Sequence, residues 1–150
     1  MYLVNQMLTD APVTLSTFIH FMAILDPVTD RADLQTAIAT PQTRLIACLC
    51  TDWCRICREY REAFDTLSAR RPDLYFIWID IEKHGDWLGD FEIENFPTLL
   101  IQESSSEPDT AQFFGPLLPI IGILERMLDS ETLDNHIVPA PDLRPHLRMI

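Results

Sequence analysis

Two cysteines, Cys54 and Cys57, lie close together in the run Trp53-Cys54-Arg55-Ile56-Cys57. A cysteine thiolate attacks a disulfide sulfur, and a second thiol nearby then resolves the mixed disulfide that forms. The positive end of a helix and its free N–H groups stabilise a thiolate, and a neighbouring arginine adds positive charge. If a helix begins at Cys54, then Cys54 is the attacking thiol. Arg55 adds positive charge that favours its thiolate, and Cys57 resolves the mixed disulfide. The run therefore predicts thiol–disulfide exchange.

All four cysteines of the chain fall between Cys48 and Cys57. A secreted disulfide scaffold spreads its cysteines along the chain, so this clustering favours local chemistry. We interpret Cys50 as a buried unreactive cysteine, with a third redox thiol as the alternative. In a strand, Cys48 and Cys50 would share a face, which leaves a four-cysteine metal site open as a further alternative. We predict no bound metal and no cofactor, because the histidines lack ligand spacing and no glycine-rich phosphate loop is present.

The apolar pattern predicts the elements that must position these thiols. Helices are predicted over 31–39, 54–70, 85–90 and 117–128, and strands over 44–50, 74–81, 98–102 and 111–114. Strands separated by helices are expected to pair in parallel, and the last two strands, joined by a polar turn, to form an antiparallel hairpin. The fold class is therefore α/β, with a mixed central sheet and helices on both faces.

The helix over 54–70 follows directly after a buried strand and a short loop. Its apolar face is predicted to consist of Ile56, Tyr60, Phe64 and Leu67, which recur at helical spacing. Cys54 then lies at the junction of loop and helix, where the chemistry described above needs it.

Composition excludes several kinds of partner. The chain has 150 residues, the size of one domain, and a net charge of −12. Such a negative protein lacks the basic face that nucleic acid or an anionic membrane would require. The apolar stretch over 11–25 is too short to span a bilayer and has no basic residues before it, unlike a signal peptide. We therefore expect no nucleic acid or membrane partner and a cytoplasmic location.

Two motifs resemble those of the thioredoxin family. The run Trp53–Cys57 resembles its Trp-Cys-x-x-Cys motif, which follows a buried strand and opens a helix. The segment Phe91–Thr98 resembles its aromatic-x-Ile-x-x-apolar-Pro-Thr stretch. The motifs occur in the expected order and at a similar interval, and the resemblance covers about residues 28–130. It implies the thioredoxin fold and the activity of a protein-disulfide oxidoreductase.

The resemblance also implies roles for residues around the cysteines. Pro97 would be cis and would face the redox site, and Trp53, Phe96 and Pro97 would bind the substrate. Expected partners are protein disulfide substrates and an electron donor of the thioredoxin-reductase type.

The sequence departs from the family in its tuning residues. Arg55-Ile56 replaces the usual Gly-Pro, and the added positive charge predicts a less reducing potential. The family's buried acid aligns with Cys48 and its accompanying lysine with Trp78, so the usual proton relay is absent.

The resemblance divides the chain into an N-terminal extension over 1–27, a thioredoxin-like domain over 28–132 and a proline-rich C-terminal tail over 133–150. The tail is predicted to be extended, because its prolines disfavour regular structure. Two other functions remain open. One is a binding or assembly factor that does not need redox turnover, and the other is a metal carrier that uses the four cysteines.

Overall fold

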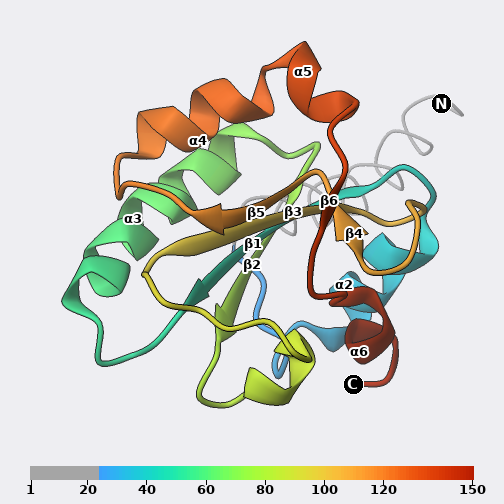
Figure 1. Ribbon diagram of the computed structural model, residues 1–150, viewed down its shortest axis with the longest axis horizontal. Helices are drawn as coiled ribbons and strands as arrows, with labels where there is room; N and C mark the ends of the chain where they lie inside the picture. The colour runs from blue at the N-terminus through green and yellow to red at the C-terminus, as the bar shows by residue number, and fades with distance from the viewer. Residues whose placement is uncertain (1–23) are drawn as a thin grey trace, which may run out of the picture.

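The computed structural model describes residues 24–150, which form a four-stranded sheet with helices on both of its faces (Figure 1). The strand order is β2-β1-β3-β5, formed by β1 (Arg44–Cys50), β2 (Tyr75–Asp80), β3 (Thr98–Glu103) and β5 (Phe113–Pro116). The helices are α2 (Arg31–Ala39), α3 (Arg55–Arg70), α4 (Ile121–Leu128), α5 (Glu131–Asp134), α6 (Arg144–Arg148) and the 3₁₀ helix η1 (Gly85–Leu88). A two-stranded sheet pairs β4 (Thr110–Ala111) with β6 (Val138–Pro139). The predicted fold class is confirmed.

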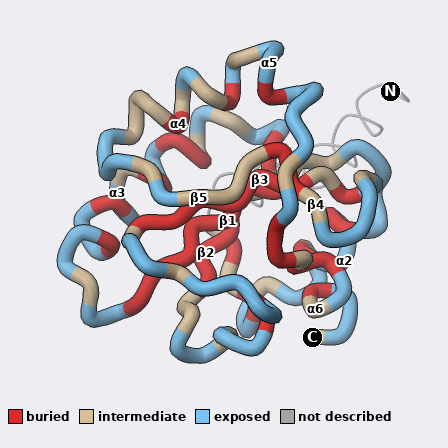
Figure 2. Tube along the Cα trace, in the orientation of Figure 1, coloured by how far each residue is buried: buried red, intermediate tan, exposed pale blue. Residues whose placement is uncertain are grey.

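The central strands are buried on both faces, as their continuous apolar runs predict. Helices α3 and α4 cover one face of the sheet, and α2 and α6 cover the other, while Figure 2 shows the strands between them as the buried layer. Successive residues of β1 alternate between the two layers. Its residues toward α2 are Leu45, Ala47 and Leu49, and its residues toward α3 are Ile46, Cys48 and Cys50.

Strand pairing corrects one prediction. β1 pairs in parallel with β2, and β3 pairs antiparallel with β5, both as predicted. However, β3 is antiparallel to β1, so the parallel pairing expected for the strand after the helix at 85–90 is wrong. A parallel connection must return the chain along the sheet, and a six-residue strand is about 20 Å long. The connection from β2 contains only the four-residue η1, about 8 Å long, and no helix that returns the chain along the sheet, and β3 starts at the end of the sheet where β2 stops.

The C-terminal segment is not an extended tail, so that prediction is wrong. It forms the edge strand β6 and the short helix α6, and Ala140, Leu143 and Leu147 are buried in the core beside α2. The prolines are compatible with this packing. Pro139 lies in a two-residue edge strand, and Pro145 lies in the first turn of α6, where a missing N–H breaks no helical hydrogen bond.

Arg144 anchors the C-terminal segment and is only 3% exposed. Its guanidinium donates to both carboxylate oxygens of Asp142 at 2.8 Å. It also donates to the backbone carbonyls of Glu103, Ser106 and Glu107, each at 2.8 Å. One buried side chain thus joins α6 to the turn that follows β3.

The start of the described chain adds to the edge of the sheet. Leu25 N–H donates to Phe76 O at 2.8 Å, and Trp78 N–H donates to Leu25 O at 3.1 Å, which forms a parallel bridge beside β2. The rest of the expected N-terminal extension, residues 1–23, lies outside the described residues. Within 24–150, no helix combines the length and apolar character needed to cross a bilayer.

Candidate redox site

Cys54 is the N-cap of α3, at the junction that the sequence predicts. Its Sγ accepts a hydrogen bond from the backbone N–H of Cys57 at 3.4 Å. Its own N–H donates to Thr51 O at 3.3 Å, which closes the short loop after β1. An N-cap side chain satisfies an N–H that the helix leaves unpaired, and the helix N-terminus favours negative charge there. The Cys54 sulfur therefore occupies a position that stabilises a thiolate.

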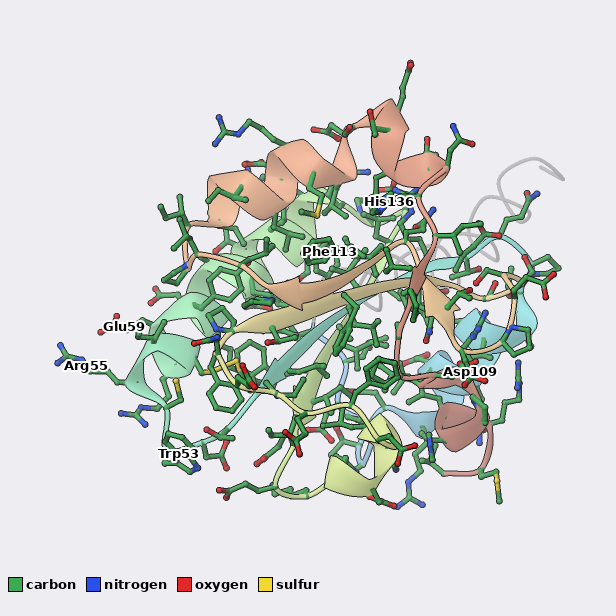
Figure 3. All side chains as sticks on the ribbon, viewed as in Figure 1. Trp53, Arg55, Glu59, Asp109, Phe113 and His136 are labelled. Carbon is green, nitrogen blue, oxygen red and sulfur yellow. A yellow bond between two sulfur atoms is a disulfide. The ribbon has the colours of Figure 1, made fainter. Side chains whose placement is uncertain are left out.

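Cys57 is buried on the first turn of α3, and its sulfur is bonded to Cys50 at the end of β1. The two Cα atoms are 5.9 Å apart, a usual separation for a disulfide. Figure 3 shows a sulfur–sulfur bond beside the start of α3. Cys54 is left as a free, partly exposed thiol. The structure thus brings Cys54 and Cys57 together through an N–H···S contact and bonds Cys57 to Cys50, so Cys50 is a disulfide partner and not a free buried thiol.

Cys48 lies behind this pair, on the same face of β1 as expected. Its Sγ is 3.6 Å from the Cys50 Sγ, and its side chain is fully buried. Burial raises the pKa of the Cys48 thiol well above its ordinary value, against the lowering effect of the Arg61 guanidinium. Cys48 is therefore a protonated thiol at neutral pH. No group of three or more His, Cys, Asp or Glu side chains within residues 24–150 is arranged to hold a metal ion.

Two aromatic side chains lie in contact next to Cys54. Trp53 is 63% exposed and donates from Nε1 to Glu82 Oε1 at 2.6 Å. Its ring meets that of Phe96 edge to face, with centroids 5.8 Å apart. Phe96 and Cys54 both border the core layer on the α3 side of the sheet. The hydrogen bond to Glu82 fixes the indole, so an exposed apolar surface is held next to the free thiol.

Pro97 lies directly before β3 and is buried. The Phe96–Pro97 peptide bond is cis, which confirms the expectation from the family resemblance. Pro97 O accepts from Leu117 N–H at 3.2 Å, so the proline is held between β3 and the segment before α4. The motif around Pro97 and the motif around Cys54 thus meet through the contact of Phe96 with Trp53.

Arg55 points away from the core. Its side chain is 84% exposed, and its Nε donates to Glu59 Oε1 at 3.1 Å, one helical turn further along α3. Figure 3 shows the two labelled side chains on the outer side of α3, away from the sheet. Because Glu59 partly neutralises Arg55 and solvent screens both charges, the effect of Arg55 on the redox site is small.

Ile56 is 46% exposed, so its predicted place on the buried face of α3 is wrong. The buried stripe begins instead at Cys57 and continues through Tyr60, Phe64 and Leu67. A buried cysteine behaves as a small hydrophobe, and this allows Cys57 to begin the stripe. The shift by one residue leaves Ile56 as an apolar side chain on the surface next to Cys54.

Three features together define a thioredoxin-type fold. They are a mixed sheet with helices on both faces, a cysteine that caps the helix after the central strand, and a cis proline before the antiparallel strand. The thioredoxin family model matches residues 27–116, and the chain belongs to the thioredoxin family.

Individual relatives agree with this assignment. A thioredoxin H-type protein of Picea mariana is 31% identical over 80 residues, which are 53% of this chain and 62% of that protein, so the chain spans less than two thirds of this relative's length. The long form of thioredoxin f from spinach chloroplast matches with a TM-score of 0.59 and 14% identity, covering 77% of this chain and 92% of that one. A thioredoxin f2, crystallised with ferredoxin:thioredoxin reductase, matches with a TM-score of 0.55 and 13% identity over 73% of this chain and 96% of that one.

Proposed function

We propose that the chain is a protein-disulfide oxidoreductase that works by dithiol–disulfide exchange, with Cys54 as the attacking thiol and Cys57 as the resolving thiol. The observation that supports this best is the state of Cys54. It is the one cysteine of the four that is both free and partly exposed, and it caps a helix N-terminus. A substrate disulfide therefore meets Cys54 first.

The reaction balances without a cofactor. The Cys54 thiolate attacks one sulfur of the substrate disulfide, and the other sulfur leaves as a thiolate that takes up a proton. The Cys57 thiolate then attacks the Cys54 sulfur, which forms a Cys54–Cys57 disulfide and releases the second substrate thiol. An external dithiol reduces the protein again. Resolution needs Cys57 as a thiol, so turnover starts from the protein in which the Cys50–Cys57 bond is reduced.

The substrate-binding residues in this proposal are Trp53, Phe96, Pro97 and Ile56. Trp53 and Ile56 offer exposed apolar surface on either side of Cys54 in the sequence, and Phe96 joins that surface to the cis proline. The electron donor in this proposal is a reductase of the thioredoxin-reductase type, and a reductase partner is supported by the thioredoxin f2 that forms a complex with ferredoxin:thioredoxin reductase. We place the protein in the cytoplasm.

The test is the reduction of a fluorescently labelled disulfide-linked peptide, with dithiothreitol as the electron source. The wild-type protein is expected to accelerate the reaction, and the double variant Cys54→Ala/Cys57→Ala is expected to leave only the uncatalysed rate. Cys48→Ala is the matched control, since it removes a cysteine of the same cluster that takes no part in the exchange. A double variant as fast as the wild type would sink the redox proposal and favour a binding or assembly factor.

Replacing Arg55 should change the redox potential of the Cys54–Cys57 pair only slightly. We expect a wild-type potential between about −270 and −180 mV, measured in glutathione buffers. Arg55→Ala removes positive charge from the thiolate form, so the potential should become more negative, by less than about 30 mV, a tenfold change in the equilibrium constant. Glu59→Gln is the opposite control, because it removes the partner of Arg55 and should raise the potential. A shift of Arg55→Ala toward positive values would contradict the tuning role.

A further inference from the structure

We propose that Cys50 is a third redox-active cysteine, which displaces Cys54 from its disulfide with Cys57. The stable oxidised protein then carries a Cys50–Cys57 disulfide and a free Cys54 thiol. The exchange rests on the proposed function, because the Cys54–Cys57 disulfide produced by turnover is its starting material. Cys50 thereby acts on the redox state of the site without meeting the substrate.

The backbone places Cys50 and Cys57 for a direct bond. Cys50 is the last residue of β1 and points toward α3, and Cys57 is buried on the first turn of that helix. Their Cα atoms are 5.9 Å apart, a usual separation for a disulfide, so the packing of β1 against α3 accommodates this bond. Cys50 is also held in place, since its carbonyl accepts from Ile81 N–H at 3.0 Å.

The exchange balances internally. The Cys50 thiolate attacks the Cys57 sulfur, the new bond between those two sulfurs forms, and the bond from Cys57 to Cys54 breaks with its electron pair on the Cys54 sulfur. The proton lost by Cys50 matches the one that Cys54 takes up, and no oxidant is consumed. The leaving sulfur is the one at the helix N-terminus, beside the N–H of Cys57. The sulfur released in the exchange thus stays in contact with a backbone N–H at the end of the helix.

Cys48 lies next to Cys50 but does not compete with it for Cys57. Its sulfur is 3.6 Å from that of Cys50, but the structure bonds Cys57 to Cys50 and leaves Cys48 free. Cys48 is completely enclosed, and burial raises its pKa, so it holds its proton at neutral pH. The geometry therefore selects Cys50 as the partner of Cys57, at a Cα separation of 5.9 Å.

The consequence is a second state of the protein. With Cys57 bonded to Cys50, the resolving thiol is occupied, while Cys54 is still able to attack a disulfide. A mixed disulfide formed at Cys54 in this state persists until the Cys50–Cys57 bond is reduced. Cys50 thus converts a turnover catalyst into a form that captures one disulfide partner covalently.

The test maps the disulfide of the full chain after oxidation with one equivalent of diamide. Free thiols are first alkylated with iodoacetamide in the native protein, and the remaining thiols are alkylated with N-ethylmaleimide after unfolding. Cleavage after arginine and before aspartate separates the cysteines into peptides 45–51, 52–55 and 56–58. Cys48 and Cys50 fall in the first peptide, Cys54 in the second and Cys57 in the third.

The wild-type protein is expected to yield 45–51 linked to 56–58, with Cys54 alkylated by iodoacetamide. Cys50→Ala should instead yield 52–55 linked to 56–58, with Cys54 no longer alkylated, and Cys48→Ala should match the wild type. A wild-type protein in which Cys57 is linked to Cys54, or Cys50 to Cys48, would overturn the role of Cys50. The wild-type result by itself tests the role of Cys50, so the test does not depend on whether Cys50→Ala folds.

The mapping separates the role of Cys50 from the proposed function. Reduction of the labelled peptide together with a Cys54–Cys57 link in the oxidised wild type would leave the oxidoreductase intact and remove Cys50 from it. If the peptide is not reduced but the Cys50–Cys57 link forms, the proposed function is overturned. Cys50 and Cys57 would then be a buried pair that can be oxidised but takes no part in peptide reduction.

Discussion

Replacing Cys54 with alanine is expected to slow disulfide reduction on the order of 10³-fold or more, because loss of a nucleophile removes the covalent route entirely. Cys57→Ala should have a different defect. Its Cys54 still attacks, but the mixed disulfide lacks its resolving thiol and should accumulate. Initial rates with the labelled peptide measure the first effect, and the intact mass of the protein after a short incubation with the peptide measures the second.

Cys48→Ala provides the comparison for both variants, since it deletes a sulfur from the same core layer without touching Cys54 or Cys57. It should retain turnover and accumulate no adduct. Turnover by Cys54→Ala at the wild-type rate, or a peptide adduct on that variant, would assign the attack to another cysteine.

Replacing Arg144 with methionine is expected to lower the free energy of unfolding by about 3–5 kcal/mol, the usual cost of breaking a buried charge pair. Asp142 would lose both of its hydrogen bonds from the guanidinium. The carbonyls of Glu103, Ser106 and Glu107 would also lose a donor in a partly buried region. Urea unfolding followed by circular dichroism measures the change, which is a large part of the stability of an ordinary domain.

The loss should depend on pH in a definite direction. Burial raises the pKa of Asp142, but hydrogen bonds from Arg144 and from the backbone N–H of Asp109 outweigh it, so the pKa of the folded protein lies below the ordinary value. Such a group stabilises the fold above its unfolded pKa, near about 4, and loses that contribution as the pH falls through the folded pKa. The difference between Arg144→Met and the wild type should therefore be full at pH 7 and shrink below about pH 4.

Arg148→Met is the matched control, because Arg148 lies in the same short helix and is exposed. It should change the stability by no more than about 0.5 kcal/mol. Equal losses from Arg144→Met and Arg148→Met would show that α6 tolerates the loss of its buried anchor.

The sequence predicts the elements around the redox site because their signals are local. The apolar run of β1, the helix that Cys54 caps and the two motifs follow from periodicity, capping preference and spacing within short windows. The start of the buried stripe of α3 is off by one residue, since Ile56 and Cys57 are both acceptable apolar residues and only the packing against the sheet chooses between them.

The C-terminal segment shows a limit of local signals. Its prolines point to an extended chain, yet Leu143 and Leu147 enter the core and Arg144 bonds to backbone carbonyls about 40 residues earlier in the chain. A short sequence window contains no information about those acceptors. The same holds for β3, whose antiparallel direction follows from where the connection from β2 ends in space.

The sequence alone determined that two cysteines occupy the start of a helix after a buried strand, and that a proline motif accompanies them. The tertiary structure decided which sulfur Cys57 joins. Cys54 is the neighbour in the sequence, but β1 aims Cys50 at the first turn of α3 with a Cα separation of 5.9 Å. A disulfide forms where two Cα atoms lie at the right distance and their side chains converge, and for Cys50 and Cys57 that geometry exists only once strand and helix have packed together.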